Sequence, residues 1–242
     1  MPQDTVPIEQ PEPSRNDVWR MFDRIAPRYD LLNRLLSMRQ DVAWRKRLAR
    51  LLPERENQHV LDLATGTGDV LLSLCRHSSK VRFGVGMDMA GQMLVRGQEK
   101  VRHLGVPAFM VRADATCIAA ADDAFDAVTI AFGIRNVLDV GQALREMYRV
   151  LKPGGRVLVL EFSLPASRLL RAPYLFYFRN VLPRIGGLIS GDSHAYRYLN
   201  TTVETFPYGE AFCKILRDTG FHQVQSHPLS FGIATIYQGD KP

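Results

Sequence analysis

The sequence is poor in the residues that build disulfide frameworks and zinc sites. Its three cysteines, Cys75, Cys117 and Cys213, stand too far apart for the close pairs of zinc fingers or redox motifs. Unpaired thiols are typical of a reducing compartment, so we expect a cytoplasmic protein and no metal site. No stretch approaches the roughly 18 apolar residues of a membrane-spanning helix. The first residues hold no apolar core, which argues against a secretory signal.

Acidic residues are scarce in two stretches, although the net charge of the whole chain is only +6. Residues 15–50 contain ten arginines and lysines against four aspartates. Residues 165–199 contain five arginines against one aspartate, so the remaining sequence is net acidic. Such a stretch is either the solvated face of a helix or a surface that attracts nucleic acid or phospholipid headgroups, and charge alone leaves both readings open.

The order of the expected elements is typical of an α/β fold. Residues 1–14 contain four prolines and no periodic apolar pattern, so we expect a flexible tail there. Apolar residues at helical spacing predict a helical prefix over 15–56, interrupted at Pro27. From 57 to 163, short apolar strands alternate with helices, which predicts a parallel sheet covered on both faces.

The alternation of strands and helices stops after Ser163. Residues 164–200 are rich in aromatic side chains and arginines and are interrupted by prolines and glycines, and we expect them to form a lid. Residues 201–242 predict a closing helix and two strands, whose short connection requires antiparallel pairing. The length favours a single domain over 15–242.

Ligands of open parallel sheets bind at the carboxyl ends of the strands, and three successive predicted strands end in polar residues. The first runs into the turn Asp62-Leu63-Ala64-Thr65-Gly66-Thr67-Gly68-Asp69, whose glycines let a ligand approach the backbone. Asp88 ends the second strand, where a carboxylate can accept hydrogen bonds from both hydroxyls of a ribose. Asp114 and Ala115 follow the third strand, where they can pair with the edge of an adenine.

A carboxylate that binds the hydroxyls of a ribose is consistent with two cofactors: a dinucleotide and S-adenosylmethionine. The dinucleotide fingerprint needs a third glycine, and Leu71 stands in its place, which argues against a nicotinamide-dependent oxidoreductase. Asp62 and Asp69 flank the turn, where they repel a diphosphate and attract the sulfonium and amine of S-adenosylmethionine. A non-enzymatic binding module would not need the polar pair Arg135-Asn136 beside the ligand.

Several stretches of the sequence carry a family resemblance: YDLLN (29–33), followed by Trp44-Arg45, LDLATGTGD (61–69), FGIRNVLD (132–139), YRVLKPGGRVLVLEFS (148–163), AYRYL (195–199) and ETFP (204–207). On these stretches the chain, from about Asp17 to its end, resembles the C-methyltransferases of ubiquinone and menaquinone biosynthesis. The resemblance implies a class I S-adenosylmethionine-dependent methyltransferase fold, which is Rossmann-like, with a mostly parallel seven-stranded sheet, an N-terminal helical prefix and a helical lid.

The resemblance also implies which residues hold the cofactor. Thr67, Asp88 and the Asp114-Ala115 pair occupy the family's cofactor-contacting positions. Ala131 stands where the family has a serine, so that contact is either lost or made by the backbone. The full set that we expect to bind S-adenosylmethionine is Asp62, Gly66, Thr67, Gly68, Asp88, Met89, Asp114, Ala115 and Ala131.

The reaction that the resemblance implies is methylation of a ring carbon of a prenylated hydroquinone, converting demethylmenaquinol to menaquinol. Ionising a phenol at pH 7 costs about 4 kcal/mol, and we expect Arg135 to supply the stabilising cation. Asn136 is expected to hold the phenol oxygen and Tyr29 to close the site. Since arginine stays protonated, an ordered water or His194 would take the proton. The alternatives are the equivalent benzoquinol methylation in ubiquinone biosynthesis and methylation of RNA.

The expected lid carries five successive aromatic or leucine side chains, residues 174–178, within the arginine-rich segment 168–189. Such a segment either packs on the core or dips into a bilayer to collect a lipid substrate, with its arginines at the headgroups. We expect a prenylated quinol as the partner, peripheral contact with the inner face of the cell membrane, and no nucleic acid; a homodimer is left open. The expected substrate contacts are Phe176, His194, Tyr196 and Tyr198.

Overall fold

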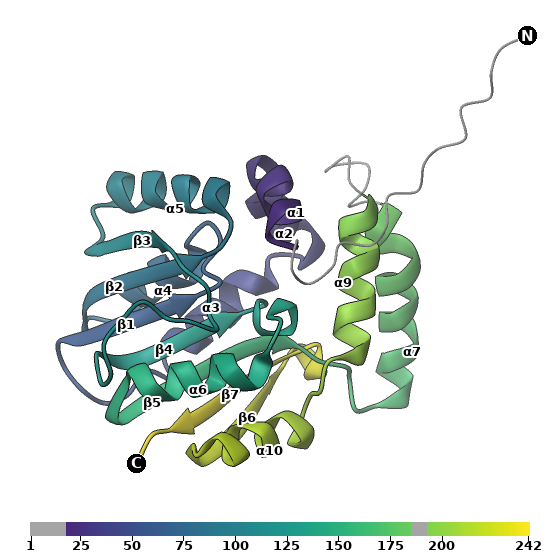
Figure 1. Cartoon of the computed structure of the whole chain (residues 1–242). Helices are drawn as coiled ribbons and strands as arrows, with labels where there is room; N and C mark the ends of the chain where they lie inside the picture. The colour runs from purple at the N-terminus through teal and green to yellow at the C-terminus, as the bar shows by residue number, and fades with distance from the viewer. Residues whose placement is uncertain (1–17, 185–192) are drawn as a thin grey trace, which may run out of the picture.

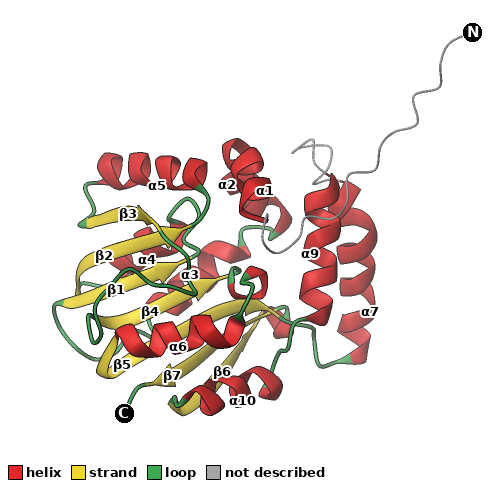
Figure 2. Ribbon diagram, in the orientation of Figure 1, coloured by secondary structure: helices red, strands yellow, loops and turns green. Residues whose placement is uncertain are grey.

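The computed structural model describes residues 18–184 and 193–242, without the side chains of Leu36 and of residues 193–197. A single sheet of seven strands, in the order β3-β2-β1-β4-β5-β7-β6, forms its centre and carries helices on both faces (Figures 1 and 2). The predicted tail, 1–14, lies outside the described residues. The strands are β1 Gln58–Leu63, β2 Val81–Asp88, β3 Ala108–Arg112, β4 Phe125–Ala131, β5 Leu151–Phe162, β6 His222–Leu229 and β7 Ala234–Asp240.

The direction of the strands follows the prediction from the sequence. Strands β1 to β5 pair in parallel, and β7 pairs antiparallel with both β5 and β6, which confirms the expected pairing of the two closing strands. The strand order reverses between β1 and β4. Because ligands of such sheets bind at the reversal, the carboxyl ends of β1 and β4 are where a site is expected.

Alternation along each strand divides the core between the two faces of the sheet. Leu61 and Leu63 pack in one cluster with α6 and α10, whereas Val60 packs in another with α3 and α4 (Figure 1). Apolar side chains on both faces explain why the strands read as nearly continuous apolar runs. The helices of this part are α4 Asp69–His77, α5 Gly91–Leu104, α6 Val140–Val150 and α10 Glu210–Thr219.

The predicted prefix is helical and lies beside the carboxyl edge of the sheet (Figure 1). Its helices are α1 (Val18–Ile25), α2 (Tyr29–Leu36) and α3 (Gln40–Ala49). A short 3-10 turn that contains Pro27 separates α1 from α2, so the predicted interruption is confirmed. The prefix therefore covers the edge at which the polar strand ends lie.

The described residues of the predicted lid include α7 (Arg168–Phe176), a π-helical turn (Tyr177–Val181) and the first part of α9 (Ser193–Thr205), which continues past the expected end of the lid at residue 200. The helices α7 and α9 stand side by side apart from the sheet (Figure 1). Pro173 lies inside α7 and does not end it, so the interruption expected at this proline is wrong. One apolar cluster joins the prefix to this lid: Val18, Met21, Leu32, Phe178, Leu182, Tyr198 and Val203.

Candidate active site

The turn after β1 has a backbone that demands glycine at two positions. Gly66 and Gly68 have φ angles of +56° and +79°, in the left-handed region that other residues rarely adopt. A Cβ atom at Gly68 would also lie 2.4 Å from the terminal methyl of Met110. The backbone N–H of Gly66 donates a 2.8 Å hydrogen bond to Oδ2 of Asp88, which fixes the turn against the end of β2.

Asp88 is anchored and still has acceptor capacity. Its two oxygens accept 2.8 Å hydrogen bonds from the backbone N–H groups of Gly66 and Ala90. Burial raises the pKa of this carboxyl, and the backbone N–H groups counteract part of that rise. A carboxylate has about four lone-pair sites, so two remain for hydroxyl groups of a ligand.

A polar cavity opens at this edge of the sheet. It has an empty volume of about 970 Å³, part of it open to solvent, and is walled on one side by Val18 and Trp19 of α1. Asn136 lines it, and its Oδ1 is buried without a hydrogen-bond partner among the described residues. Among the expected cofactor-binding residues, the cavity is lined by Gly66, Asp88, Met89, Asp114, Ala115 and Ala131.

The other expected cofactor-binding residues lie behind the turn. Asp62 is 1% exposed and accepts 2.6 Å hydrogen bonds from the hydroxyls of Thr65 and Thr129, and its burial raises its pKa to about 7. The Thr67 hydroxyl donates a 2.6 Å hydrogen bond to Asp30 of α2, and Gly68 starts α4. Asp62, Thr67 and Gly68 therefore shape the turn from beneath and do not line the cavity.

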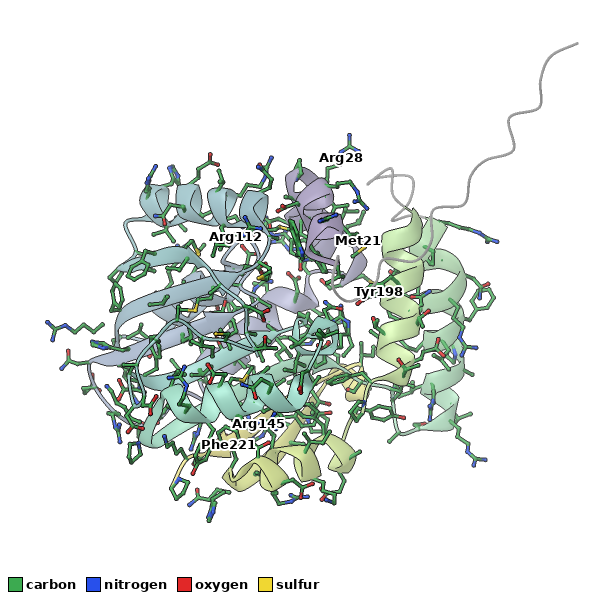
Figure 3. All side chains as sticks on the ribbon, viewed as in Figure 1. Met21, Arg28, Arg112, Arg145, Tyr198 and Phe221 are labelled. Carbon is green, nitrogen blue, oxygen red and sulfur yellow. The ribbon has the colours of Figure 1, made fainter. Side chains whose placement is uncertain are left out.

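A second, apolar cavity adjoins the polar one. It lies between the prefix, the lid and the loop after β4, with an empty volume of about 1230 Å³ that is partly open to solvent. Met21 of α1 and Tyr198 of α9, both labelled in Figure 3, line it from the prefix and from the lid. Phe22, Tyr29 and Phe132 line both cavities, so these side chains mark the place where the two ligand spaces meet.

The loop after β4 is held in a strained shape at this junction. Phe132 has a φ angle of +55°, which is rare for a bulky residue. A Cβ atom at Gly133 would lie 2.4 Å from the Cβ of Ala64, so only glycine lets this loop approach the turn after β1. The following 3-10 turn, Ile134–Asn136, carries two of the expected catalytic side chains.

Arg135 lines the apolar cavity but is 5% exposed and heavily engaged. Its Nη1 donates to the carbonyl oxygen of Phe132 at 2.6 Å and to Oε1 of Glu161 at 2.7 Å. Its guanidinium carbon lies 5.5 Å from the ring centre of Phe162. The third expected catalytic residue, Tyr29, is packed edge-on against Phe22, and burial raises its pKa, so it stays protonated near neutral pH.

The expected substrate contacts divide into three groups. Tyr198 lines the apolar cavity. Phe176 is 65% exposed and lines neither cavity, whereas Tyr174, Tyr177 and Phe178 of the same segment do line the apolar one. The side chains of His194 and Tyr196 lie outside the described residues.

The sequence analysis missed several residues of the site. Glu161, the partner of Arg135, stands at the end of a strongly apolar strand, and that isolated acid was a signal for it. Asn33, Gln40 and Asp41 of the prefix also line the apolar cavity, and no sequence pattern distinguishes them from surface residues.

Within residues 18–184 and 193–242, three or more His, Cys, Asp or Glu side chains nowhere gather as they would around a metal ion. In the same residues, every helix is too short or too polar to cross a membrane.

Comparison with known proteins gives a consistent result. The model of the ubiE/COQ5 methyltransferase family matches residues 10–241. The chain is 47% identical over 226 residues to the ubiquinone/menaquinone biosynthesis C-methyltransferase UbiE of Geotalea daltonii, covering 93% of this chain and 96% of that one. It is 48% identical over 222 residues to the demethylmenaquinone methyltransferase of Thermus thermophilus, covering 92% of this chain and all of that one.

Solved structures with the same fold are more distant in sequence. An S-adenosylmethionine-dependent methyltransferase of Thermotoga maritima has a TM-score of 0.67 at 21% identity, with 93% of this chain and 99% of that chain covered. Phosphoethanolamine N-methyltransferase 2 of Haemonchus contortus, in complex with S-adenosyl-L-methionine, has a TM-score of 0.59 at 16% identity, with 81% of this chain and 51% of that chain covered. This likeness confirms the expected class I methyltransferase fold.

Proposed function

Because the chain belongs to the ubiE/COQ5 methyltransferase family, we propose that it is an S-adenosylmethionine-dependent C-methyltransferase that converts demethylmenaquinol to menaquinol. The observation that carries the proposal is the junction of a polar cavity, which holds Asp88, with an apolar cavity, which holds Arg135. A polar methyl donor and an apolar acceptor can meet there. Methylation of the corresponding benzoquinol in ubiquinone biosynthesis is the alternative, because both acceptors present a phenol and a prenyl tail.

The polar cavity offers hydrogen-bonding groups that suit S-adenosylmethionine. Asp88 has lone pairs for the ribose hydroxyls, and Asp114 and the backbone at Ala115 lie where the adenine edge is expected. Val18 and Trp19 of the prefix cover the cavity with apolar surface. When bound, S-adenosylmethionine supplies an electrophilic methyl group.

The residues at the junction suit activation of a phenol. A ring carbon becomes nucleophilic when the neighbouring phenol ionises, which costs about 4 kcal/mol at pH 7 in water. The guanidinium of Arg135 faces an apolar cavity, where a charge acts more strongly than in water. Asn136 lies on the other side of the junction and has an unpartnered acceptor, and Tyr29 closes the site between the two cavities. Holding methyl donor and ring carbon in line supplies the remaining rate acceleration.

The apolar cavity suits a prenyl tail. Aromatic side chains from the prefix, the end of β5 and the lid wall it, among them Trp44, Phe162 and Phe178. Burying a tail there gains about 0.8 kcal/mol per methylene group. A cavity that binds S-adenosylmethionine does not by itself distinguish one methyl acceptor from another. The aromatic lining of the adjoining apolar cavity is what favours a prenylated acceptor over RNA.

Peripheral contact with the inner face of the cell membrane is a further part of the proposal. Leu169 of α7 is 87% exposed and Met38, at the rim of the apolar cavity, is 72% exposed. Leu31 and Leu35 of α2 are also exposed, so both the prefix and the lid carry large apolar side chains on the protein surface. Arg168 and Arg171 of α7 supply charges for anionic headgroups. A homodimer that covers the same side chains is the competing arrangement, and a soluble dimer without liposome binding would identify it.

An incubation with labelled S-adenosylmethionine tests the proposed function. The acceptors are reduced demethylmenaquinone, the corresponding reduced benzoquinone precursor and bulk transfer RNA. We expect label in the naphthoquinol product. Label only in RNA, or in no acceptor, contradicts the proposal, and label only in the benzoquinol replaces it with the alternative.

A further inference from the structure

Glu161 is a buried acid whose only described ionic partner is Arg135. The acid is 1% exposed and the arginine 5%, and Oε1 of Glu161 lies 2.7 Å from Nη1 of Arg135. Oε1 also accepts a 2.8 Å hydrogen bond from the backbone N–H of Phe162. Glu161 lines neither cavity, so its contact with a ligand runs through the arginine in front of it.

The ion pair leaves Nη2 of the Arg135 guanidinium free to bind a ligand. Nη1 carries two hydrogens, and two acceptors use them, the Phe132 carbonyl and Glu161. Nε is buried and has no hydrogen-bond partner among the described residues. Nη2 makes no hydrogen bond among the described residues and is not buried, and because Arg135 lines the apolar cavity, Nη2 is the nitrogen that can donate to a ligand there.

The pair also sets the charge of the site. Burial raises the pKa of Glu161, and the charge of Arg135 and the backbone N–H of Phe162 oppose that rise. With Glu161 ionised, one buried cation beside one buried anion is neutral as a unit, which lowers the cost of keeping Arg135 charged in apolar surroundings. The other titratable groups around Arg135 are Tyr29 of α2 and Tyr174 of α7, and burial raises the pKa of both, so they stay neutral. Tyr237 of β7 faces Glu161 and has its pKa raised to about 12, mainly by burial.

We propose that Glu161 is a positioning residue for methyl transfer: it holds Nη1 of Arg135, so that Nη2 of the guanidinium is presented to the phenol oxygen of the acceptor. Its negative charge also balances that cation until the phenol ionises. This inference rests on the proposed function. It goes beyond it in assigning a role to a residue that touches neither ligand.

The charges of Arg135 and Glu161 should shift the pH dependence of kcat in opposite directions. The phenol must lose its proton before its ring carbon attacks the methyl group, so turnover rises with pH. Arg135 favours the phenolate and Glu161 opposes it. Removing the charge of Glu161 therefore shifts the rise of kcat to lower pH, whereas removing the charge of Arg135 shifts it to higher pH.

A double-mutant cycle tests the proposal, with Glu161→Gln, Arg135→Gln and the double variant. Turnover of reduced demethylmenaquinone and calorimetric affinity for S-adenosylmethionine are measured for each, with thermal unfolding as the folding check. We expect E161Q to lower kcat at pH 8 by about tenfold while cofactor affinity stays within about twofold. In the R135Q background, E161Q should lower kcat no further, because the loss in E161Q comes from a misplaced Arg135.

The control is Glu146→Gln, which removes a carboxylate paired with Arg149 at 2.8 Å on α6, outside both cavities. It should leave kcat and its pH dependence unchanged. The role of Glu161 is overturned if the fold loss of kcat in the double variant equals the product of the two single losses. It is also overturned if E161Q and E146Q show the same kcat and the same pH dependence of kcat. If E161Q fails to fold, Glu161→Asp replaces it, because the shorter side chain withdraws the charge from Nη1, and kcat that is unchanged in E161D is the overturning result.

A spectroscopic readout separates this inference from the proposed function. A prenylated naphthol is titrated in the presence of S-adenosylhomocysteine, and its ionisation is followed by absorbance. We expect its bound pKa to be lower with E161Q than with the wild type and higher with R135Q. An unchanged value in E161Q overturns the inference, even where the wild type methylates the quinol. A wild type that methylates no quinol contradicts the proposed function instead.

Discussion

The carboxylate of Asp88, at the tip of β2, accepts a 2.8 Å hydrogen bond from the backbone N–H of Gly66, in the turn after β1. This bond joins two strand ends that meet at the polar cavity. The acid is thereby oriented before any ligand arrives, with lone pairs remaining for hydroxyl groups. The first prediction follows from this arrangement.

Asp88→Ala should weaken binding of S-adenosylmethionine by about 100-fold, since two hydrogen bonds to a charged acceptor are lost. Titration calorimetry measures the change. The matched control is Asp218→Ala, which removes a surface carboxylate paired with Lys214 on α10 and should leave binding unchanged. Equal affinities of D88A and the wild type would contradict the ribose-binding role.

Arg135→Lys should lower kcat by about 100-fold and change cofactor affinity by less than about threefold. Lysine keeps the charge but cannot donate to Phe132, Glu161 and a phenol oxygen with one planar group. Arg145→Lys is the control. Among the described residues Arg145 (labelled in Figure 3) donates only to Gln142, and this pair lies on the solvent-exposed side of α6. Equal losses in turnover and in cofactor binding would sink the catalytic assignment of Arg135.

Phe178→Ala should raise KM for a long-tailed quinol more than KM for a short-tailed one, because Phe178 is buried in the wall of the apolar cavity. The cavity left behind also destabilises the fold by about 3 kcal/mol. Its neighbour Phe176 is exposed, so F176A serves as the comparison and should change neither KM measured in detergent. A larger effect from F176A would restore Phe176 as a substrate contact.

Leu169→Glu should reduce co-flotation with anionic liposomes, since it places a negative charge on the most exposed apolar position of α7. The control is Leu104→Glu at the end of α5, where the leucine is also exposed but belongs to neither the lid nor the prefix. Wild-type protein that floats with neither anionic nor neutral liposomes removes the membrane proposal.

Asp62→Asn should flatten the dependence of stability on pH. Burial raises the pKa of Asp62 from its ordinary range to about 7 in the folded protein. The protonated form therefore favours folding, and this stabilisation is fully present below about pH 4 and lost as pH rises through about 7, by at most about 4 kcal/mol. Melting temperatures of both proteins from pH 5 to 8 measure the difference, and parallel curves would contradict the raised pKa.

The sequence predicted the elements that local pattern determines. Apolar runs of strand length alternate with helical periodicity, so the sheet and the strand ends at Asp88 and Asp114 followed from the chain alone. Pro27 interrupted the prefix as expected, because proline lacks an N–H and fixes φ. Pro173 did not interrupt α7, although it lacks an N–H and fixes φ in the same way.

What the chain alone determined about this protein is therefore its fold, its family resemblance and which strand ends carry polar groups. Which polar groups face the ligand spaces was decided by tertiary structure. Asp62 and Thr67 turn away into hydrogen bonds with Thr129 and Asp30, partners far away in the sequence. Glu161 becomes the partner of Arg135 only because β4 and β5 lie side by side. Local patterns record backbone preference and burial, whereas the direction of a side chain depends on neighbours that only the folded chain brings together.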